Sequence, residues 1–545
     1  MIDGFDKRKF LTRLLIGIAI LYFFVGLNFD LNIYDEGIGL VNAERVGTGD
    51  IPYRDFFTIY TPLNYYLTAA YSMLFGGSVM SPRFLVLIMF VLSLGTMHKI
   101  IQKSNDNKPL FIAGLIIMVL LFFKPFYAYA KPTAPAIMFS VFALLFTVNQ
   151  IYEEIYIWKD DDSEPEKKPK PLIKYLILSG VMSGFTILSR HFMGMYLLIA
   201  IASAVFFTFD IPIKQRIRSY LIILVSTATV IIPFAVYFLI NVPWDSLYSQ
   251  LFYIPVTIFP AYRSLSWPSI TGILNAETLR QQLMMLWLFV YSFIPFLVFL
   301  FTAISFIKAK RRNELTPRLK AALPIAVFAL LLVMQASVRS DVEHFIPTWI
   351  FSLLTLFVVF DFKKSKKIYS AFVFIIIIAF ISFPVADKTT IINKIYDKGN
   401  YTKITTIPRA ERFIISKNWY KDLSPAVKYI RKNTNRNEKI FVCNNDNDKS
   451  YIIDVMFYFL AERLPGTRYH ELHPGISTTK SVQEEIIRDL KKNNVQYIVL
   501  FKSYFYSDEP NLSSKSSGVK LLDNYIRNNY SPAVRYGNYQ IMKHN

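Results

Sequence analysis

The sequence of 545 residues contains one cysteine, Cys443, which excludes an intramolecular disulfide and any metal site built from several cysteines. Acidic residues are also scarce, with 39 Asp and Glu against 60 Lys and Arg. The basic residues cluster between apolar segments, as in membrane proteins, so no nucleic-acid partner is expected. The N-terminal segment lacks the small-residue cleavage motif of a signal peptide and is predicted to be retained as a first membrane span.

Long apolar segments dominate the sequence, in which 53% of the residues are hydrophobic and 16% are aromatic. Assigning the basic clusters to the cytoplasm predicts about eleven crossings, with the N-terminus inside and the C-terminus outside. The apolar segment 62–76 is predicted to be an interfacial helix, because a crossing there would put most basic clusters outside. The predicted spans are 14–28, 83–98, 110–123, 134–150, 174–188, 192–209, 219–240, 283–305, 321–337, 346–360 and 369–385.

The composition changes near residue 386, where polar residues become frequent and apolar runs shorten. Helix and strand patterns then alternate, which predicts a soluble α/β domain over 386–545 with a small, mostly parallel sheet. The predicted fold class is therefore a mainly α-helical polytopic membrane domain over 1–385, followed by an extracytoplasmic α/β domain. The first outer loop, 29–82, belongs to the membrane domain in this division.

The predicted topology gathers nearly all the ionisable side chains of the membrane domain, apart from the cytoplasmic basic clusters, on the outer face. Such groups at span ends, facing one cavity, indicate a functional site. A mixture of carboxylates and cations there suits a reaction with an anionic leaving group. The residues concerned are Asp35, Glu36, Lys124, Lys131, Arg190, His191, Arg263, Arg339, Asp341, Glu343 and His344.

The first outer loop carries an ordered series of short motifs. They are Asp35-Glu36, Ala43-Glu44-Arg45, Gly49-Asp50-Ile51-Pro52, Pro62 with Tyr65-Tyr66, Phe75-Gly76 and Arg83. This order resembles the first outer loop of polytopic glycosyltransferases of the C fold (GT-C). The most similar branch contains the protein O-mannosyltransferases and the lipid A aminoarabinose transferase (glycosyltransferase family 39-like). The sequence departs from the aminoarabinose branch at Tyr60-Thr61-Pro62, where that branch has Lys-Pro-Pro.

The resemblance implies an enzyme of the cell membrane that moves a hexosyl or pentosyl group from a polyprenyl-phosphate donor. The acceptor hydroxyl lies on the extracytoplasmic face, and protein, lipid and polysaccharide acceptors all remain open. Such a reaction needs a general base, and Asp35 is the first candidate, with Glu36 next. A single base and a direct displacement predict inversion at the anomeric carbon. The alternative for this acidic pair is the first turn of a helix, where acidic residues are favoured.

The donor phosphate needs cations, for which the candidates are Arg339, Arg190 and His344, followed by Lys131 and Lys124. Candidates for contact with the sugar or acceptor are Asp55, Arg54, Tyr60, Tyr65 and Asp341. For Arg54 and Asp55 a salt bridge within a turn is the alternative, and for the tyrosines it is an aromatic belt at the membrane interface. Arg45 and Arg83 are expected to fix the first loop instead.

No residue pattern indicates a cofactor, and the participation of a divalent metal is left open. A different class of function also remains: a transporter or flippase that binds the same lipid-linked sugar without transferring it. Transporters typically place polar residues near the middle of the membrane, in broken helices. The charged residues here lie at the span ends instead, which favours the enzyme.

Overall fold

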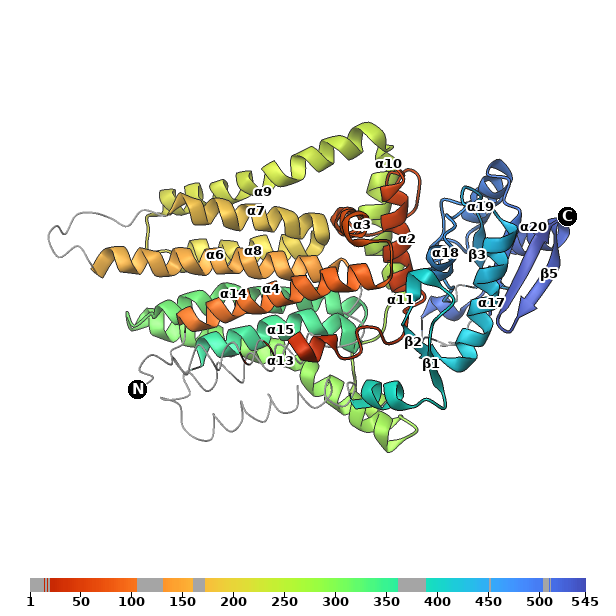
Figure 1. The fold of residues 1–545 in the computed structure, drawn as a ribbon. Coiled ribbons are helices and arrows are strands. Elements are labelled where there is room, and N and C mark those ends of the chain that lie inside the picture. Colours follow the sequence, from red (N-terminus) through yellow and green to blue (C-terminus); the bar gives the residue numbers. More distant parts are fainter. Residues whose placement is uncertain are drawn as a thin grey trace, which may run out of the picture.

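The computed structural model describes residues 14, 17, 20–104, 131–159, 172–360, 389–449, 452–502, 509 and 511–545. It consists of a bundle of long helices with an α/β domain at one end (Figure 1). The predicted fold class, a mainly helical polytopic membrane domain followed by an α/β domain, is confirmed. Lys124 and the predicted spans 110–123 and 369–385 fall outside the described residues, and span 14–28 is described only in part.

Six of the described helices are long and apolar enough to cross a membrane. Two shorter apolar helices, α7 and α8, lie among them. Each of these eight coincides with a predicted span, and the chain is a multi-pass membrane protein. They are α4 (Met80–Ser104), α6 (Thr133–Lys159), α7 (Ile173–Ser189), α8 (His191–Phe207), α9 (Ile213–Asn241), α13 (Leu279–Arg311), α14 (Pro317–Val338) and α15 (Val342–Val359).

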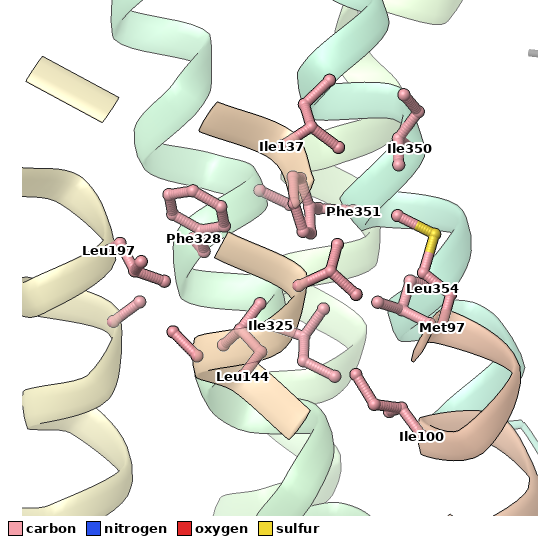
Figure 2. Packing of buried hydrophobic residues seen from close by; sticks show 14 of the residues in the cluster. Met97, Ile100, Ile137, Leu144, Leu197, Ile325, Phe328, Ile350, Phe351 and Leu354 are labelled. Carbon is pink, nitrogen blue, oxygen red and sulfur yellow. The ribbon is translucent and has the colours of Figure 1, made fainter. Parts of the chain in front are cut away.

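The centre of the bundle is a single apolar cluster to which α4, α6, α8, α14 and α15 all contribute. Figure 2 shows Phe328 of α14 next to Phe351 of α15, whose ring centroids are 4.7 Å apart at an angle of 68°. Edge-to-face pairs of this kind stabilise a core beyond the area that they bury. The rigid centre holds the helix ends, and the loops that join them, in fixed positions.

Helices α7 and α9 pack through two glycines spaced four residues apart, Gly180 and Gly184. A Cβ atom on Gly180 would lie 2.4 Å from the carbonyl oxygen of Ile223, and one on Gly184 would lie 2.7 Å from Cβ of Val230. The close approach lets Thr227 donate a hydrogen bond to the Gly180 carbonyl oxygen at 2.9 Å. Small residues at this spacing are a common way for membrane helices to associate.

We expect Gly180→Val to lower the melting temperature of the purified protein markedly, because the new side chain must push α7 away from α9. Gly95→Ala is the matched control, since nothing lies within 4 Å of a Cβ atom added at Gly95 in α4. The control is expected to melt at or slightly above the temperature of the wild type, because alanine favours helix by about 1 kcal/mol. Equal melting temperatures for both variants would contradict this packing.

Helices α2 (Asp35–Gly47) and α3 (Leu63–Phe75) belong to the segment predicted to be the first outer loop and lie between the bundle and the α/β domain (Figure 1). Helix α3 occupies the segment predicted to be an interfacial helix. Helix α2 packs directly on the α/β domain, and a Cβ atom on Gly37 would lie 2.4 Å from the backbone nitrogen of Met456. Ile38 and Val41 of α2 belong to the same apolar cluster as the core of that domain. The first loop and the C-terminal domain therefore share one core.

The four-stranded sheet of the C-terminal domain has the order β3-β4-β6-β5. Strands β3 (Phe441–Cys443) and β4 (Tyr497–Phe501) are parallel, whereas β6 (Tyr539–His544) is antiparallel to both β4 and β5 (Tyr530–Tyr536). The prediction of a mostly parallel sheet is therefore wrong. The sheet is mixed because a tight turn at Gly537, with φ of +52°, joins β5 and β6 as an antiparallel hairpin.

The remaining elements connect or cover these parts. Between α9 and α13 the chain forms α10 (Trp244–Tyr248), the π-helix η2 (Ser249–Ile258), α11 (Phe259–Arg263) and α12 (Ile270–Leu274). A small antiparallel pair, β1 (Tyr401–Lys403) and β2 (Ile414–Ser416), precedes the larger sheet. The other elements are η3 (Pro408–Ala410), α17 (Lys417–Asn433), α18 (Met456–Ala461), α19 (Lys480–Lys492), η4 (Leu512–Ser514) and α20 (Leu521–Asn529).

Candidate active site

A cavity of about 630 Å³ lies where the helix bundle meets α2 and the C-terminal domain. Its walls come from the start of α2, the α7–α8 junction, the end of η2, α11 and the α14–α15 junction. Ile452 and His473 of the C-terminal domain complete the lining. Segments that are distant in the sequence thus meet around one space, large enough for a small-molecule ligand.

Eight of the twelve predicted site residues line this cavity. Among the described residues, Glu36, Arg54 and Asp55 are not part of the lining, and Lys124 lies outside the described residues. The eight lining residues are Asp35, Tyr60, Tyr65, Lys131, Arg190, Arg339, Asp341 and His344.

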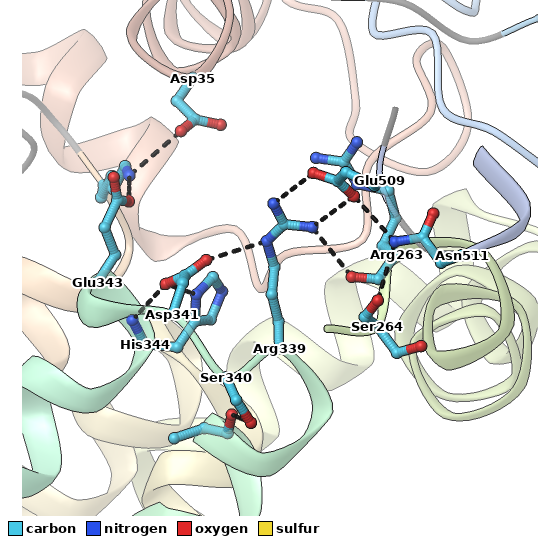
Figure 3. Close-up of polar contacts among 12 residues, drawn as sticks. Asp35, Arg263, Ser264, Arg339, Ser340, Asp341, Glu343, His344, Glu509 and Asn511 are labelled. Atoms are coloured by element: carbon cyan, nitrogen blue, oxygen red, sulfur yellow. Dashed lines mark hydrogen bonds and ion pairs between the residues drawn. The ribbon is translucent and has the colours of Figure 1, made fainter. Parts of the chain in front are cut away.

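Asp35 is the first residue of α2, and its carboxylate points into the cavity (Figure 3). Its backbone N–H donates to the side-chain oxygen of Asn32 at 2.8 Å, which fixes the first turn of the helix. The Asp35 side chain is 44% exposed, and its Oδ2 atom lies 3.1 Å from Nζ of Lys131. A carboxylate in this position is accessible to a ligand and is stabilised by a cation and by the helix N-terminus.

Glu36 has a different environment, because neighbouring residues on a helix point about 100° apart. Its side chain is only 1% exposed, and both carboxylate oxygens accept hydrogen bonds from Arg83, each at 2.7 Å. The Arg83 guanidinium also donates to the carbonyl oxygens of Leu27 and Asp30, at 2.7 and 2.8 Å. Arg83 therefore ties α4 to the first loop, as predicted.

Arg45 fixes the other end of α2. Its guanidinium donates to Asp50 at 2.7 Å, to the carbonyl oxygen of Asp55 at 2.8 Å and to that of Thr467 at 3.0 Å. The prediction that Arg45 fixes the first loop is thus confirmed, with a connection to the C-terminal domain in addition. Asp55 itself pairs with Arg54, at 2.8 Å.

We expect Arg83→Met to destabilise the protein by about 3–5 kcal/mol, because it leaves the Glu36 charge buried without its partner. Arg54→Met is the control, since the Arg54–Asp55 pair is largely exposed and such pairs contribute about 0–1 kcal/mol. Melting temperatures of the two variants in detergent provide the comparison. The double variant Arg83→Met/Glu36→Leu is expected to recover part of the loss, and its failure to do so would contradict this explanation.

Lys131 bridges two carboxylates from different elements. Its Nζ atom lies 3.1 Å from Asp35 of α2 and 3.1 Å from Glu343 of α15. The bridge closes one side of the cavity and keeps a positive charge beside Asp35.

Arg339 lies at the α14–α15 junction and directs its guanidinium along the cavity wall. It donates to Asp341 at 3.1 Å, to the carbonyl oxygen of Arg263 at 3.0 Å and to Glu509 at 2.6 and 3.0 Å. Burial opposes ionisation of Glu509, but the hydrogen bonds from Arg339 and Asn511 outweigh it and lower the pKa of Glu509 to about 2. Glu509 is therefore a carboxylate at neutral pH.

Asp341 orients His344. One Asp341 oxygen accepts from the His344 backbone N–H at 3.1 Å, as the N-cap of α15, and lies 2.7 Å from Nδ1 of the His344 ring. Burial opposes ionisation of Asp341, but these hydrogen bonds and the charge of Arg339 hold its pKa at about 2. The contact between Asp341 and Nδ1 fixes the imidazole ring of His344 and thereby orients its second ring nitrogen.

Arg190 contributes a further cation from the α7–α8 junction. Its guanidinium donates to the Thr133 hydroxyl at 2.7 Å, and the Gln335 amide, oriented with its oxygen toward it, accepts from the same group. Lys131, Arg190, Arg263 and Arg339 all line the cavity, facing the carboxylates of Asp35, Asp341 and Glu343. This arrangement can hold an anionic group next to an accessible carboxylate.

Sequence reasoning missed three contributions to this region. Glu509 lies 170 residues beyond Arg339, and no local pattern indicates that it folds back onto the bundle. Tyr34 and His473 line the cavity and lie 3.2 Å apart between the phenol oxygen and Nδ1. His473 faces Tyr34 through Nδ1 and the buried Glu471 through Nε2.

Comparisons with known proteins identify the fold. No family model and no curated protein sequence matches this chain. Among solved structures, ArnT from Cupriavidus metallidurans in the apo state superposes with a TM-score of 0.54 at 12% identity, covering 98% of both chains. The same protein bound to undecaprenyl phosphate gives a TM-score of 0.52 at 12% identity, covering 97% of both chains. The oligosaccharyltransferase of Archaeoglobus fulgidus in the apo form gives a TM-score of 0.52 at 13% identity, covering 92% of this chain and 70% of its own. The protein therefore has the GT-C fold of these membrane glycosyltransferases.

Proposed function

We propose that this protein is a membrane glycosyltransferase that moves a sugar from a polyprenyl-phosphate donor to an acceptor hydroxyl on the extracytoplasmic face. One observation carries the proposal: an accessible carboxylate, Asp35, shares a cavity with four basic side chains at one end of a GT-C bundle. One protein with this fold, ArnT, is bound to undecaprenyl phosphate in its structure. A donor of that class suits a cavity that combines cations with a lipid-facing helix bundle.

Asp35 acts as the general base in this proposal. The acceptor oxygen attacks the anomeric carbon from the side opposite the carrier phosphate, and the hydroxyl proton passes to Asp35. The bond between the anomeric carbon and the phosphate oxygen breaks, and its electron pair leaves with the phosphate. One displacement of this kind inverts the anomeric configuration. Proton transfer to a well-placed base contributes about 10²–10⁴-fold to the rate.

Arg339, Arg190 and His344 bind the donor phosphate and stabilise the charge that it gains as the bond breaks. Preorganised donors aimed at a developing negative charge are among the strongest contributions that a site makes to catalysis. Lys131 lies between Asp35 and Glu343, so its role in this proposal is to orient the base as well as to add positive charge.

Tyr60 and Tyr65 provide surfaces for the sugar or acceptor. Both line the cavity, and the Tyr65 hydroxyl is held by Thr58 at 2.7 Å. Asp341 holds the side chains of His344 and Arg339 in place through hydrogen bonds. Glu36 receives no role as a base, and Arg54 and Asp55 receive none in sugar binding, since all three are engaged in ion pairs away from the lining.

A panel of radiolabelled polyprenyl-phosphate sugars, presented to the purified protein in nanodiscs with candidate acceptors, tests the proposal. We expect one donor to yield free carrier phosphate and a glycosylated acceptor. Binding of a donor without turnover, across the whole panel and all acceptors, would overturn the proposal and favour a transporter of lipid-linked sugars.

A further inference from the structure

The C-terminal domain supplies one carboxylate, that of Glu509, to the Arg339 guanidinium. The contact is bidentate, with Nη2 donating to Oε1 at 2.6 Å and Nη1 donating to Oε2 at 3.0 Å (Figure 3). The Glu509 side chain is 14% exposed, so this pair is largely shielded from water. A shielded bidentate pair is much stronger than an exposed surface ion pair.

The position of Glu509 is built into the surrounding structure. Asn511 donates one hydrogen bond to Glu509 at 2.9 Å and another to the carbonyl oxygen of Ser264 at 2.8 Å. Arg263 adds a second positive charge that favours the ionised carboxylate. The backbone beside Arg339 is held in turn, because Leu265 and Arg339 form an isolated bridge. The Glu509 carboxylate is therefore held in a fixed position next to two arginines.

A carboxylate and a phosphate approach a guanidinium in the same way, each through two parallel hydrogen bonds. Glu509 thus occupies the N–H groups of Arg339 through which that residue would hold the carrier phosphate. The two anions cannot use the same pair of N–H groups at once. A phosphate that binds to Arg339 must replace Glu509 there, and Glu509 must replace the phosphate when the site empties.

We propose that Glu509 competes with the carrier phosphate for Arg339 and thereby promotes release of the spent carrier. The inference rests on the proposed function. After transfer, the carrier is a phosphate monoester with a charge of about −1.5 to −2 at pH 7, more negative than the phosphodiester donor. A cluster of cations holds such a product tightly. The internal carboxylate lowers the affinity for this product because it offers Arg339 an alternative anion.

Glu509→Gln tests this competition, since it removes the charge but keeps an oxygen that can accept from Asn511. We expect radiolabelled undecaprenyl phosphate to bind the variant in nanodiscs about tenfold more tightly, the effect of removing one competing charged pair. Steady-state turnover is expected to fall with product inhibition increased, while the rate of a single turnover stays within about twofold of the wild type. A purely structural role would instead lower both rates together.

Glu485→Gln is the matched control. Glu485 also belongs to the C-terminal domain and pairs with an arginine, Arg468, at 3.3 Å, but Arg468, unlike Arg339, does not line the cavity. Asn511→Ala is a second variant that loosens Glu509 without removing it, and it should shift the affinity in the same direction as Glu509→Gln. The melting temperature of each variant separates a change in affinity from a loss of folded protein.

The outcomes separate this inference from the proposed function. Tighter binding by Glu509→Gln and Asn511→Ala, with Glu485→Gln unchanged, supports the competition. Equal affinity in the wild type and in both variants overturns the inference and leaves the proposed function standing. Absence of binding to the wild type and to every variant overturns both. If Glu509→Gln does not fold, an unchanged affinity in Asn511→Ala alone is sufficient to reject the competition.

Discussion

Replacing Asp35 with asparagine is expected to lower sugar transfer at least about a hundredfold, because it removes the base that takes the acceptor proton. The substitution keeps the size of the side chain and its ability to accept a hydrogen bond from Lys131, so donor binding should persist. The measurement is the steady-state release of carrier phosphate together with the affinity for the donor. The effect is expected in kcat rather than in KM, because the proton moves only as the reaction proceeds.

Asp50→Asn is the control for this experiment. Asp50 lies just after the same helix and pairs with Arg45 at 2.7 Å, but it is not part of the cavity lining. It should alter stability more than turnover. Full turnover by Asp35→Asn, with donor affinity unchanged, would show that another group accepts the proton and would refute the assignment of the base.

Replacing Arg339 with methionine is expected to lower kcat by about 10²–10³-fold, the effect of removing one preorganised donor to a developing negative charge. The loss in donor affinity should be smaller, since the phosphate gains charge as its bond to the sugar breaks. Arg339→Lys is expected to recover only part of the rate, because an ammonium cannot form the bidentate contact. Rates are to be measured at saturating donor.

Two variants control for indirect effects of the Arg339 substitution. Arg468→Met also removes an arginine that joins the C-terminal domain to another part of the chain, because Arg468 binds Glu485 and the Tyr53 carbonyl oxygen, but Arg468 is not part of the cavity lining. The double variant Arg339→Met/Glu509→Gln removes the carboxylate that the single variant leaves without its arginine. Recovery of the rate in the double variant would mean that the unpaired Glu509, and not the missing cation, causes the defect.

The helical membrane part of the fold was predictable because apolar length and basic clusters each report on membrane spans. The same reasoning predicted that Asp35, Lys131, Arg190 and Arg339 face one cavity, because the span ends that carry them were all assigned to one side of the membrane. The prediction of a mostly parallel sheet was wrong, because a two-residue turn at Gly537 pairs β5 and β6 as an antiparallel hairpin. A short turn inside a strand-like segment leaves little trace in composition, although it reverses the chain.

Other parts of the site depend on contacts that local sequence does not contain. The different roles of Asp35 and Glu36 follow from the rotation of α2, which the Arg83 contact and the packing of Gly37 on Met456 fix. Glu509 meets Arg339 because residues of the C-terminal domain pack on the segment after α11, where Asn511 binds Glu509 and the Ser264 carbonyl oxygen. Neither the division of roles between Asp35 and Glu36 nor the contact between Glu509 and Arg339 can be predicted without the tertiary structure.

In the proposed reaction, a single displacement in this cavity transfers the sugar directly to the acceptor. The most direct measurement is a rapid-quench single turnover with the donor already bound to the wild-type protein, with the anomeric configuration of the product determined by NMR. A single displacement predicts an inverted product that forms at the same rate as free carrier phosphate. A product with retained configuration, or a sugar attached covalently to the protein before transfer, would contradict it.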